Sequence, residues 1–225
     1  MTLPVYVYTA RVDWDSHTTH HYLQTLTTTD QQQAKRYTHA LRLRSFVGSR
    51  LLLKRALNDI EQKNQDWHFG RQGHRLILDA AQTKLHASLS HSQDWVACVV
   101  SHSAHCGIDI EQRQPNPSYL AIAQRFFHPQ EYLWLLNEPE SSRFEVFVDV
   151  WTRKEASVKA WHVGLAHHLA SIRFDAAQLS PVACPTAFAA IPLTLHTWSC
   201  ADWQLCAAVH VHPQEPDWHY QEVCL

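Results

Sequence analysis

The sequence predicts an α+β protein built from two similar halves. Each half combines apolar strand patterns with one long helical pattern. The helical patterns cover about residues 29–59 in the first half and 142–164 in the second. Pro115 and Pro117 mark the expected loop between the halves. The division into an N-terminal module, 1–112, and a C-terminal module, 113–225, follows from these observations.

Two pairs of similar short segments, one member in each half, are consistent with this division. The segment DWVAC at 94–98 resembles DWQLC at 202–206, and each opens an apolar strand pattern. Phe-Val pairs at 46–47 and 147–148 begin the apolar part of each long helix. Matches this short also arise by chance, so by themselves they do not establish a duplication.

The first half begins with a Val- and Tyr-rich strand, and a short helix and the long helix follow. The remaining elements of this half are extended. The expected ranges are strands at 3–12, 95–100 and 107–111, two short extended pieces within 66–78 around Gly70 and Gly73, and helices at 17–26 and 29–59. The segment 86–92, rich in Ser and His, is a polar turn when it is judged alone.

The second half is expected to contain three helices before its strands. The long helix is expected to end near Gly164, and the tail from Pro213 is polar and predicted to be loosely held. The expected ranges are helices at 118–127, 129–136 and 142–164, and strands at 171–175, 191–199 and 203–211.

Composition restricts the function classes. The 225 residues are 45% hydrophobic, enough for a sizeable core, and the formal net charge is −2, so no global positive field indicates nucleic-acid binding. The first residues have neither a basic region nor a long apolar run, so we expect no signal peptide, no membrane span and a cytoplasmic location. Six scattered cysteines without a C-x-x-C pair indicate buried thiols rather than disulfides or zinc.

The stretch from Trp151 to Lys159 carries the strongest chemical signal. Trp151, Glu155 and Lys159 recur every four residues, so they share one side of the predicted helix. Asp109 and Glu111 lie two residues apart in a predicted strand and therefore share one face of it. Carboxylates of this kind bind Mg²⁺, and a lysine beside them binds phosphate.

Structural explanations exist for each of these motifs alone. A Glu–Lys pair at this spacing is commonly a surface ion pair, and alternating acids occur on solvated strand edges. The arginines and lysines of the first long helix also suit a solvated face, although a subset could point at an anion. These basic residues are Arg42, Arg44, Arg50, Lys54 and Arg55.

Together, the motifs resemble the 4'-phosphopantetheinyl transferases of the double-length surfactin-synthetase type. The segments that match the family, in its order, are Ser90-His91-Ser92, Gly107-Ile108-Asp109-Ile110-Glu111, Phe126-Phe127-His128-Pro129-Gln130-Glu131, and Trp151 with Lys154, Glu155, Ala156 and Lys159. The family's basic helix resembles Arg44 to Arg55. The resemblance covers roughly residues 30–175, and several motifs in order are more specific than any one of them.

The resemblance implies a fold of two similar modules, each a small antiparallel sheet with a long helix, and an active site in the cleft between them. It implies Mg²⁺-dependent transfer of phosphopantetheine from coenzyme A to a serine of an apo carrier protein, with release of adenosine 3',5'-bisphosphate. Asp109, Glu111 and Glu155 would bind Mg²⁺. Glu155 would also accept the serine proton, and Lys159 would stabilise charge on the pyrophosphate.

The same resemblance implies that Arg44, Ser90 and His91 hold the phosphates of coenzyme A. A family lysine before the Ser-His-Ser segment is replaced here by His74, with Arg75 beside it. The 3'-phosphate contact would pass to Arg75 or Arg71, or weaken above neutral pH as a histidine loses its charge.

A second departure follows the motif lysine, where the family commonly has a small residue and then glycine. Here Trp161 and His162 precede the glycine, and we expect them to alter contacts with pantetheine or the carrier. Apolar carrier contacts could come from Phe127, Tyr132 and Trp134, although core packing is expected for at least two of them. The double-length type is expected to be monomeric.

Two other functions remain open. A metal-dependent phosphoesterase would use the same carboxylates but leaves the basic helix and the Ser-His-Ser segment without a joint role. A non-catalytic protein that binds coenzyme A or a carrier protein is suggested only by the departures at His74 and Trp161. The sequence does not distinguish among carriers of fatty-acid, polyketide, peptide-synthetase and dedicated lipid pathways.

Overall fold

The computed structural model describes residues 2–79, 81–114, 116–164, 168–175, 181–210, 213 and 215–225. Within them the chain forms two main sheets with the strand orders β11-β1-β5-β4 and β6-β10-β9. The first sheet consists of β1 (Leu3–Arg11), β4 (His86–Ser92), β5 (Trp95–Ser101) and β11 (Pro216–Glu222). The second consists of β6 (Cys106–Gln112), β9 (Thr194–Ser199) and β10 (Trp203–Val209). The prediction of an α+β fold is confirmed.

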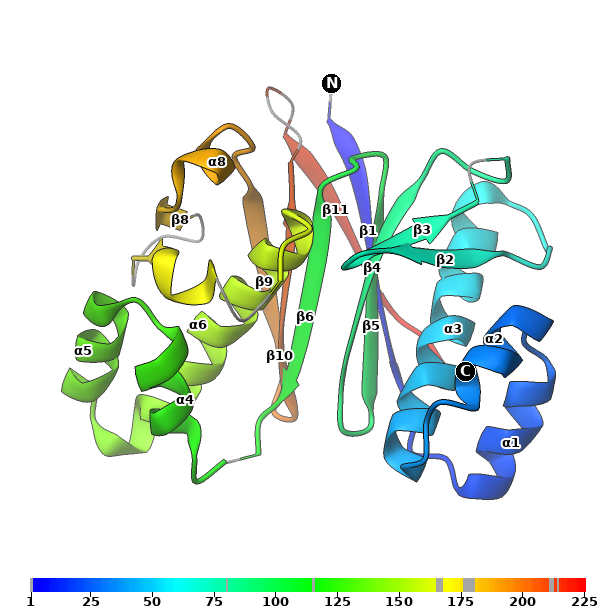
Figure 1. The fold of residues 1–225 in the computed structure, drawn as a ribbon, viewed down its shortest axis with the longest axis horizontal. Coiled ribbons are helices and arrows are strands. Elements are labelled where there is room, and N and C mark those ends of the chain that lie inside the picture. Colours follow the sequence, from blue (N-terminus) through cyan, green and yellow to red (C-terminus); the bar gives the residue numbers. More distant parts are fainter. Residues whose placement is uncertain are drawn as a thin grey trace.

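Helices cover the outer face of each sheet (Figure 1). The helices on the side of the first sheet are α1 (Ser16–Gln24), α2 (Thr28–Ala34) and α3 (Ala40–Glu61). Those on the side of the second are α4 (Tyr119–Phe126), α5 (Pro129–Asn137), α6 (Glu140–Ala160) and α8 (Thr186–Ala189). Two strand pairs, β2 (Phe69–Gln72) with β3 (Arg75–Leu78), and β7 (Arg173–Phe174) with β8 (Pro181–Ala183), and a 3-10 turn, Leu169–Ser171, complete the described elements.

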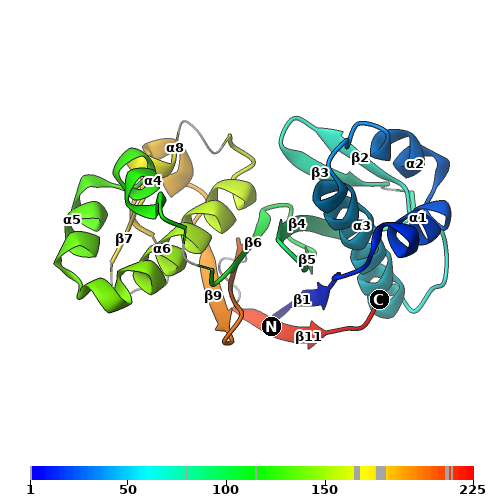
Figure 2. The ribbon, with the colours of Figure 1, turned by 90° about the horizontal axis from the view of Figure 1, so that it is seen from below.

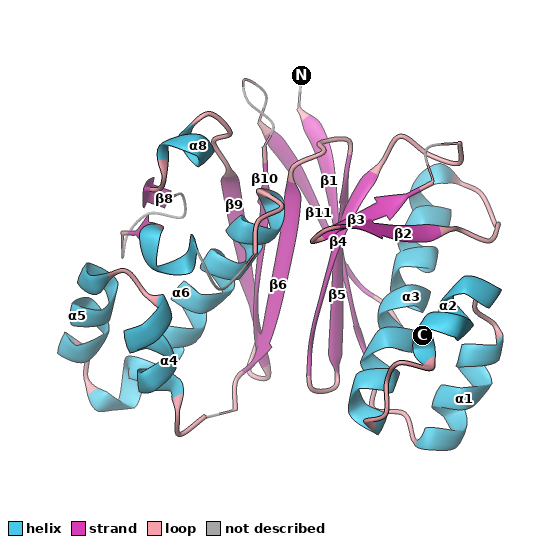
Figure 3. Cartoon of the chain, in the orientation of Figure 1, coloured by secondary structure: helices cyan, strands magenta, loops and turns pink. Residues whose placement is uncertain are grey.

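The layers run helix, sheet, sheet, helix, as the view from below also shows (Figure 2). Strand β1 illustrates why. Its Val5 and Val7 side chains pack between the two sheets, whereas Tyr8 and Ala10 pack toward α3. Successive side chains of a strand point to opposite faces. A strand that is buried on both faces therefore has a nearly continuous run of apolar residues in its sequence. The strands therefore form the centre of the molecule and the helices its flanks (Figure 3).

The contact between β6 and α6 depends on Gly107. A Cβ atom there would lie 2.1 Å from the carbonyl oxygen of Ala156 and 2.5 Å from the backbone nitrogen of Ala160. Only glycine permits this approach of strand to helix. The glycine of the acidic motif thus brings Asp109 and Glu111 onto the face of β6 that α6 covers.

The long helix expected over residues 29–59 is divided. Helix α2 ends at Ala34, α3 begins at Ala40, and the intervening segment contains Tyr37 and His39. Aromatic, β-branched and imidazole side chains in that segment have low helix propensity. Tyr37 instead packs on Phe46, with ring centroids 5.1 Å apart.

The C-terminal tail is a strand, which corrects the expectation of a loosely held tail. Strand β11 pairs with β1 in parallel, from Leu3 opposite Pro216 to Thr9 opposite Glu222. The first sheet is therefore mixed rather than antiparallel. Strand β6, assigned to the N-terminal module, pairs with β10 in the second sheet, so the sheets do not divide at residue 112. Pro115 lies outside the described residues, and the module boundary stays a prediction.

The described residues include no helix that is both long and apolar enough to cross a membrane. The longest helices, α3 and α6, carry charged side chains along their length. Their hydrophobic residues instead contribute to packing within the protein.

Candidate active site

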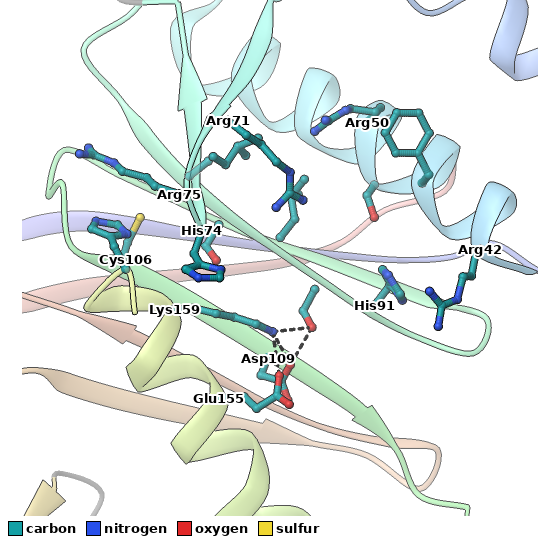
Figure 4. Close-up of a pocket in the computed structure, with 18 of the residues that line it drawn as sticks. Arg42, Arg50, Arg71, His74, Arg75, His91, Cys106, Asp109, Glu155 and Lys159 are labelled. Atoms are coloured by element: carbon teal, nitrogen blue, oxygen red, sulfur yellow. Dashed lines mark hydrogen bonds and ion pairs between the residues drawn. The ribbon is translucent and has the colours of Figure 1, made fainter. Parts of the chain in front are cut away.

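A cavity of about 490 Å³ lies where α3, β3, β4, β6 and α6 meet (Figure 4). Strands β4 and β6 belong to different sheets, yet their side chains bond directly at the base of this cavity. Ser90 on β4 donates a hydrogen bond to Asp109 on β6, and Ser92 donates one to Glu111. The segment that alone suggested a polar turn is therefore a strand whose hydroxyls hold the acidic motif.

Asp109 is the centre of the polar cluster. Its Oδ1 accepts hydrogen bonds from Lys159 Nζ at 2.6 Å and from Ser90 Oγ at 2.7 Å. Burial raises the pKa of Asp109 to about 6, because the Lys159 ammonium only partly offsets the lost hydration and the Glu111 carboxylate adds repulsion. Asp109 is 2% exposed, so its charge depends on these few partners.

Glu111 is held from two elements. Its Oε2 accepts a bond of 2.9 Å from Ser92 Oγ, and its Oε1 accepts one of 3.2 Å from Trp151 Nε1. Burial raises its pKa, and the Glu155 carboxylate adds to that shift. Trp151 also packs against Phe126, so it both anchors α6 and orients Glu111.

Glu155 faces the same point from α6. Its Oε2 lies 3.3 Å from Lys159 Nζ, and burial together with the Asp109 carboxylate raises its pKa to about 7. Burial alone would lower the pKa of Lys159, but Asp109 and Glu155 outweigh it and raise that pKa. The spacing of four along α6 places the ammonium against both carboxylates.

The carboxylate oxygens of Asp109, Glu111 and Glu155 are of the chemical type that binds a divalent cation such as Mg²⁺. Asp109 Oδ2 is buried and has no hydrogen-bond partner. Such an atom is costly to leave unpaired, and three neighbouring carboxylates with raised pKa values would be stabilised by a cation with oxygen preference. In the described part of the chain no three His, Cys, Asp or Glu side chains are arranged as a metal site, and the Lys159 ammonium contacts Asp109 and Glu155 instead.

Arginines form the opposite wall of the cavity. Arg50 is buried and paired with Asp30 at 2.9 Å. Arg42, Arg71 and Arg75 also line the cavity, and no carboxylate is paired with them among the described residues. Arg75 is hydrogen-bonded to His86 Nδ1 at 2.8 Å, which leaves its charge without a counter-charge. Guanidinium groups that lack a carboxylate partner, beside a lysine, create a place for a polyanion.

Comparison with known proteins places this geometry in a family. The model of the 4'-phosphopantetheinyl transferase superfamily matches residues 105–215. The 4'-phosphopantetheinyl transferase AcpT of Salmonella typhi is 30% identical over 167 residues, which span 69% of this chain and 83% of that protein. This chain belongs to the 4'-phosphopantetheinyl transferase superfamily.

Other members of the superfamily match over shorter shares. HetI of Nostoc sp. is 31% identical over 63% of this chain and 62% of its own length. The gsp transferase of Aneurinibacillus migulanus is 31% identical over 62% of this chain and 56% of its own length. These matches thus span somewhat more than half of those relatives, and both proteins are named 4'-phosphopantetheinyl transferases.

Most residues predicted from the superfamily motifs come together. The cavity is lined by Ser90, His91, Asp109, Glu111, Glu155, Lys159, His74 and Arg75. Arg44 does not line it: Arg44 forms an ion pair with Asp94 and donates to the carbonyl of Trp14. Arg42 lies in the cavity instead, on the same helix face as Phe46 and Arg50, because the three residues follow one another at spacings of four. This spacing is the sequence feature from which the position of Arg42 could have been predicted.

The two residues that depart from the family pattern after Lys159, Trp161 and His162, lie in different environments. Trp161 is buried, stacks on Phe188 with centroids 4.8 Å apart, and donates to the carbonyl of Ile191. It therefore lies in the core rather than at the cavity. His162 lines the cavity, so of the two residues expected to alter contacts with pantetheine or the carrier, it is the one whose position allows such a contact.

The apolar carrier-contact candidates are mainly packing residues of this superfamily member. Phe127 is buried, and Tyr132 and Trp134 are half-buried against the same cluster. Trp134 Nε1 also donates to Glu138 at 2.7 Å. The exposed apolar side chain of α5 is Leu133, at 59%.

Proposed function

We propose that this chain transfers 4'-phosphopantetheine from coenzyme A to a serine of an apo carrier protein. The serine oxygen attacks the phosphorus that bears pantetheine, and a new P–O bond forms. The bond from that phosphorus to the bridging oxygen of the pyrophosphate breaks. Adenosine 3',5'-bisphosphate leaves with the bond electrons, and the serine proton passes to a base.

One observation carries this proposal. Lys159 lies against Asp109 and Ser90 at the base of a cavity whose other wall bears three arginines without a carboxylate partner among the described residues. Phosphoryl transfer requires charge neutralisation and positioning more than covalent chemistry, and this site offers both. A pyrophosphate over Lys159 would leave further phosphate contacts to Arg42, Arg71 or Arg75.

Asp109, Glu111 and Glu155 would hold Mg²⁺. When bound, Mg²⁺ would neutralise charge on the pyrophosphate. Lys159 would then donate to a phosphate oxygen, and Ser90 and His91 would orient the pyrophosphate from β4. Glu155 would accept the proton of the carrier serine, directly or through water.

The proposal includes the architecture that the family implies. The two similar halves would be related by duplication, with α3 and α6 as equivalent helices and the site in the cleft between them. A chain that supplies both walls needs no second copy, so we expect a monomer in solution. Light scattering at micromolar concentration measures this directly, and a stable dimer would contradict it.

Mass spectrometry tests the activity. The protein is incubated with coenzyme A, Mg²⁺ and a panel of apo acyl, polyketide and peptidyl carriers. We expect the carrier serine to gain one phosphopantetheine, the gain to disappear with Glu155→Ala, and the exposed control on the same helix, Glu140→Ala, to retain it.

Each other outcome is informative. Release of inorganic phosphate without carrier would indicate a phosphoesterase. Tight binding of coenzyme A with no transfer to any carrier would indicate a binding protein, and either result would overturn the proposal. Loss of transfer after chelation of divalent cations would separately support the metal role.

A further inference from the structure

Two histidines tie the end of α6 to the turn between β5 and β6. His105 in that turn bonds through Nδ1 to the carbonyl oxygen of Ala160 at 3.1 Å. His162, just after the helix, bonds through Nε2 to the carbonyl oxygen of Ala104 at 2.8 Å. A carbonyl only accepts, so each ring must donate its N–H there. The two bonds are reciprocal: each segment supplies one imidazole and one carbonyl.

The rings also stack. Their centroids lie 5.2 Å apart with an interplanar angle of 30°. His162 has a φ of +59°, in the left-handed region that favours glycine. A non-glycine residue holds that conformation only where its surroundings fix it. The stack and the two bonds supply that constraint, at a residue that lines the cavity.

We propose that His105 and His162 form an imidazole clamp that positions the last turn of α6, and with it Lys159, against the base of the cavity. Ala160, whose carbonyl the clamp holds, directly follows Lys159. The backbone nitrogen of His162 donates to the carbonyl of Lys159 at 3.1 Å, so the clamp also closes the helix behind the lysine. This role rests on the proposed transfer, because it concerns how Lys159 is aimed at the pyrophosphate.

Protonation of both rings weakens the clamp through repulsion between them, although each ring can still donate to its carbonyl. Burial lowers the pKa of His162, the bond to the Ala104 carbonyl opposes this shift, and the charges of Arg75 and His105 add to it. Two protonated rings stacked face to face would repel each other. The other titratable or charged groups that face the pair are Arg75 on β3, His86 on β4 and His210 after β10. Farther out, His102 in the turn interacts with His86 and with Glu61, and His74 lies beside Gly164.

Two double variants separate the clamp from general packing. His105→Ala/His162→Gly removes both bonds and suits the left-handed backbone. His105→Asn/His162→Gln keeps an amide donor near each original nitrogen but cannot be protonated. Thermal melting confirms that each variant folds, and the single variant His162→Gln replaces the second if it does not.

Hydrogen exchange tests the clamp without any substrate. The amides of His162 and Val163, which donate to carbonyls of the last turn of α6, are followed by mass spectrometry. We expect exchange about tenfold faster in the Ala/Gly variant and close to wild type in the amide variant. Wild-type protection factors, which correct for the intrinsic pH dependence of amide exchange, should fall as His162 gains its proton at acidic pH, whereas those of the amide variant should show no such step. Equal exchange in all three proteins would overturn the clamp, even if the protein proves to lack transfer activity.

Kinetics test the positioning. With an active carrier, the Ala/Gly variant should raise KM for coenzyme A about tenfold and change kcat little, because Lys159 would bind phosphate in both ground and transition states. The amide variant should restore KM to the wild-type value. An unchanged KM in the Ala/Gly variant, or a KM that stays raised in the amide variant, would contradict the role. Absence of transfer by the wild type would instead count against the proposed function.

Discussion

Two lysines on α6, five residues apart, have opposite environments. Lys154 is fully buried and lies 2.7 Å from Glu131, and it also donates to the carbonyls of Leu169 and Ile172. Lys159 is 24% exposed at its side chain and lies against Asp109 at the cavity. Lys154 thus connects α6 to α5 and to the segment that follows α6. Lys159 faces a site where a substrate could replace its partners.

The difference lies in what remains unsatisfied. Both oxygens of Glu131 have partners, since Oε1 accepts from the backbone of Phe174 and Oε2 from that of His128 as well as from Lys154. Asp109 has one oxygen without any partner. A saturated buried pair holds structure, whereas an unsaturated one retains capacity for a ligand. One motif thus contains a structural lysine and a candidate phosphate-binding lysine.

The largest expected effect comes from breaking the saturated pair. Lys154→Met leaves Glu131 buried without its cation, and we expect a loss of about 3–5 kcal/mol in the free energy of unfolding. Urea denaturation measures it. Glu131→Leu/Lys154→Met should recover most of the loss, because the unpaired charge is then gone. A single variant as stable as the wild type would contradict the structural role.

The next effect is on activity. Glu155→Gln keeps shape and hydrogen-bonding capacity but removes the charge and the base, so we expect transfer to fall about 10³-fold. The melting temperature should not decrease, because the substitution removes a carboxylate that Asp109 repels. Steady-state rates and calorimetry on the same preparation separate the two readouts. Full activity would remove Glu155 from the mechanism.

Gly107→Ala should lower both stability and activity, because it separates β6 from α6, the helix that bears both lysines. The added Cβ meets backbone of α6, which cannot move aside as a side chain can. We expect a loss of about 1–3 kcal/mol in stability and reduced transfer as β6 shifts from α6. Gly70→Ala is the control, since a Cβ there meets nothing within 4 Å. Similar melting curves for the two variants would refute the close-approach explanation.

Magnesium should stabilise the cavity in a pH-dependent way. The folded pKa values of Asp109 and Glu155 are about 6 and about 7, both raised. The folded state therefore binds these protons more tightly than the unfolded state, and this contribution to stability is present near pH 4 and lost as pH rises to 7. Bound Mg²⁺ should offset that loss, by about 2–3 kcal/mol at a hundredfold excess over its Kd, at pH 8 but little at pH 5. Equal melting shifts at both pH values would argue against these carboxylates as ligands.

The smallest effect distinguishes two arginines of α3. Arg42→Ala should weaken coenzyme A binding about tenfold, because it removes an unpaired guanidinium from the cavity. Arg44→Ala should change binding little and cost stability through the lost ion pair with Asp94. Isothermal titration calorimetry with coenzyme A compares them. A larger loss of coenzyme A binding in Arg44→Ala than in Arg42→Ala would show that Arg44, and not Arg42, contacts coenzyme A.

Much of the candidate site could be predicted because its signals are local. Alternation along β6 puts Asp109 and Glu111 on one face, and a spacing of four along α6 aligns Glu155 with Lys159. These periodicities follow from backbone geometry and need no knowledge of the neighbours. The same local rules predicted most strands and helices, but not the break between α2 and α3, where weak propensity in a short segment decided the outcome.

The sequence by itself determined the α+β class, the main elements and most of the residues that converge on the cavity. The tertiary structure decided the burial of Lys154, the place of Arg42 rather than Arg44 in the cavity, the pairing of β11 with β1, and the reciprocal contacts of His105 and His162. Each of these depends on a partner distant in the chain. Local periodicity specifies which side of an element a residue occupies, whereas only packing specifies what lies against that side.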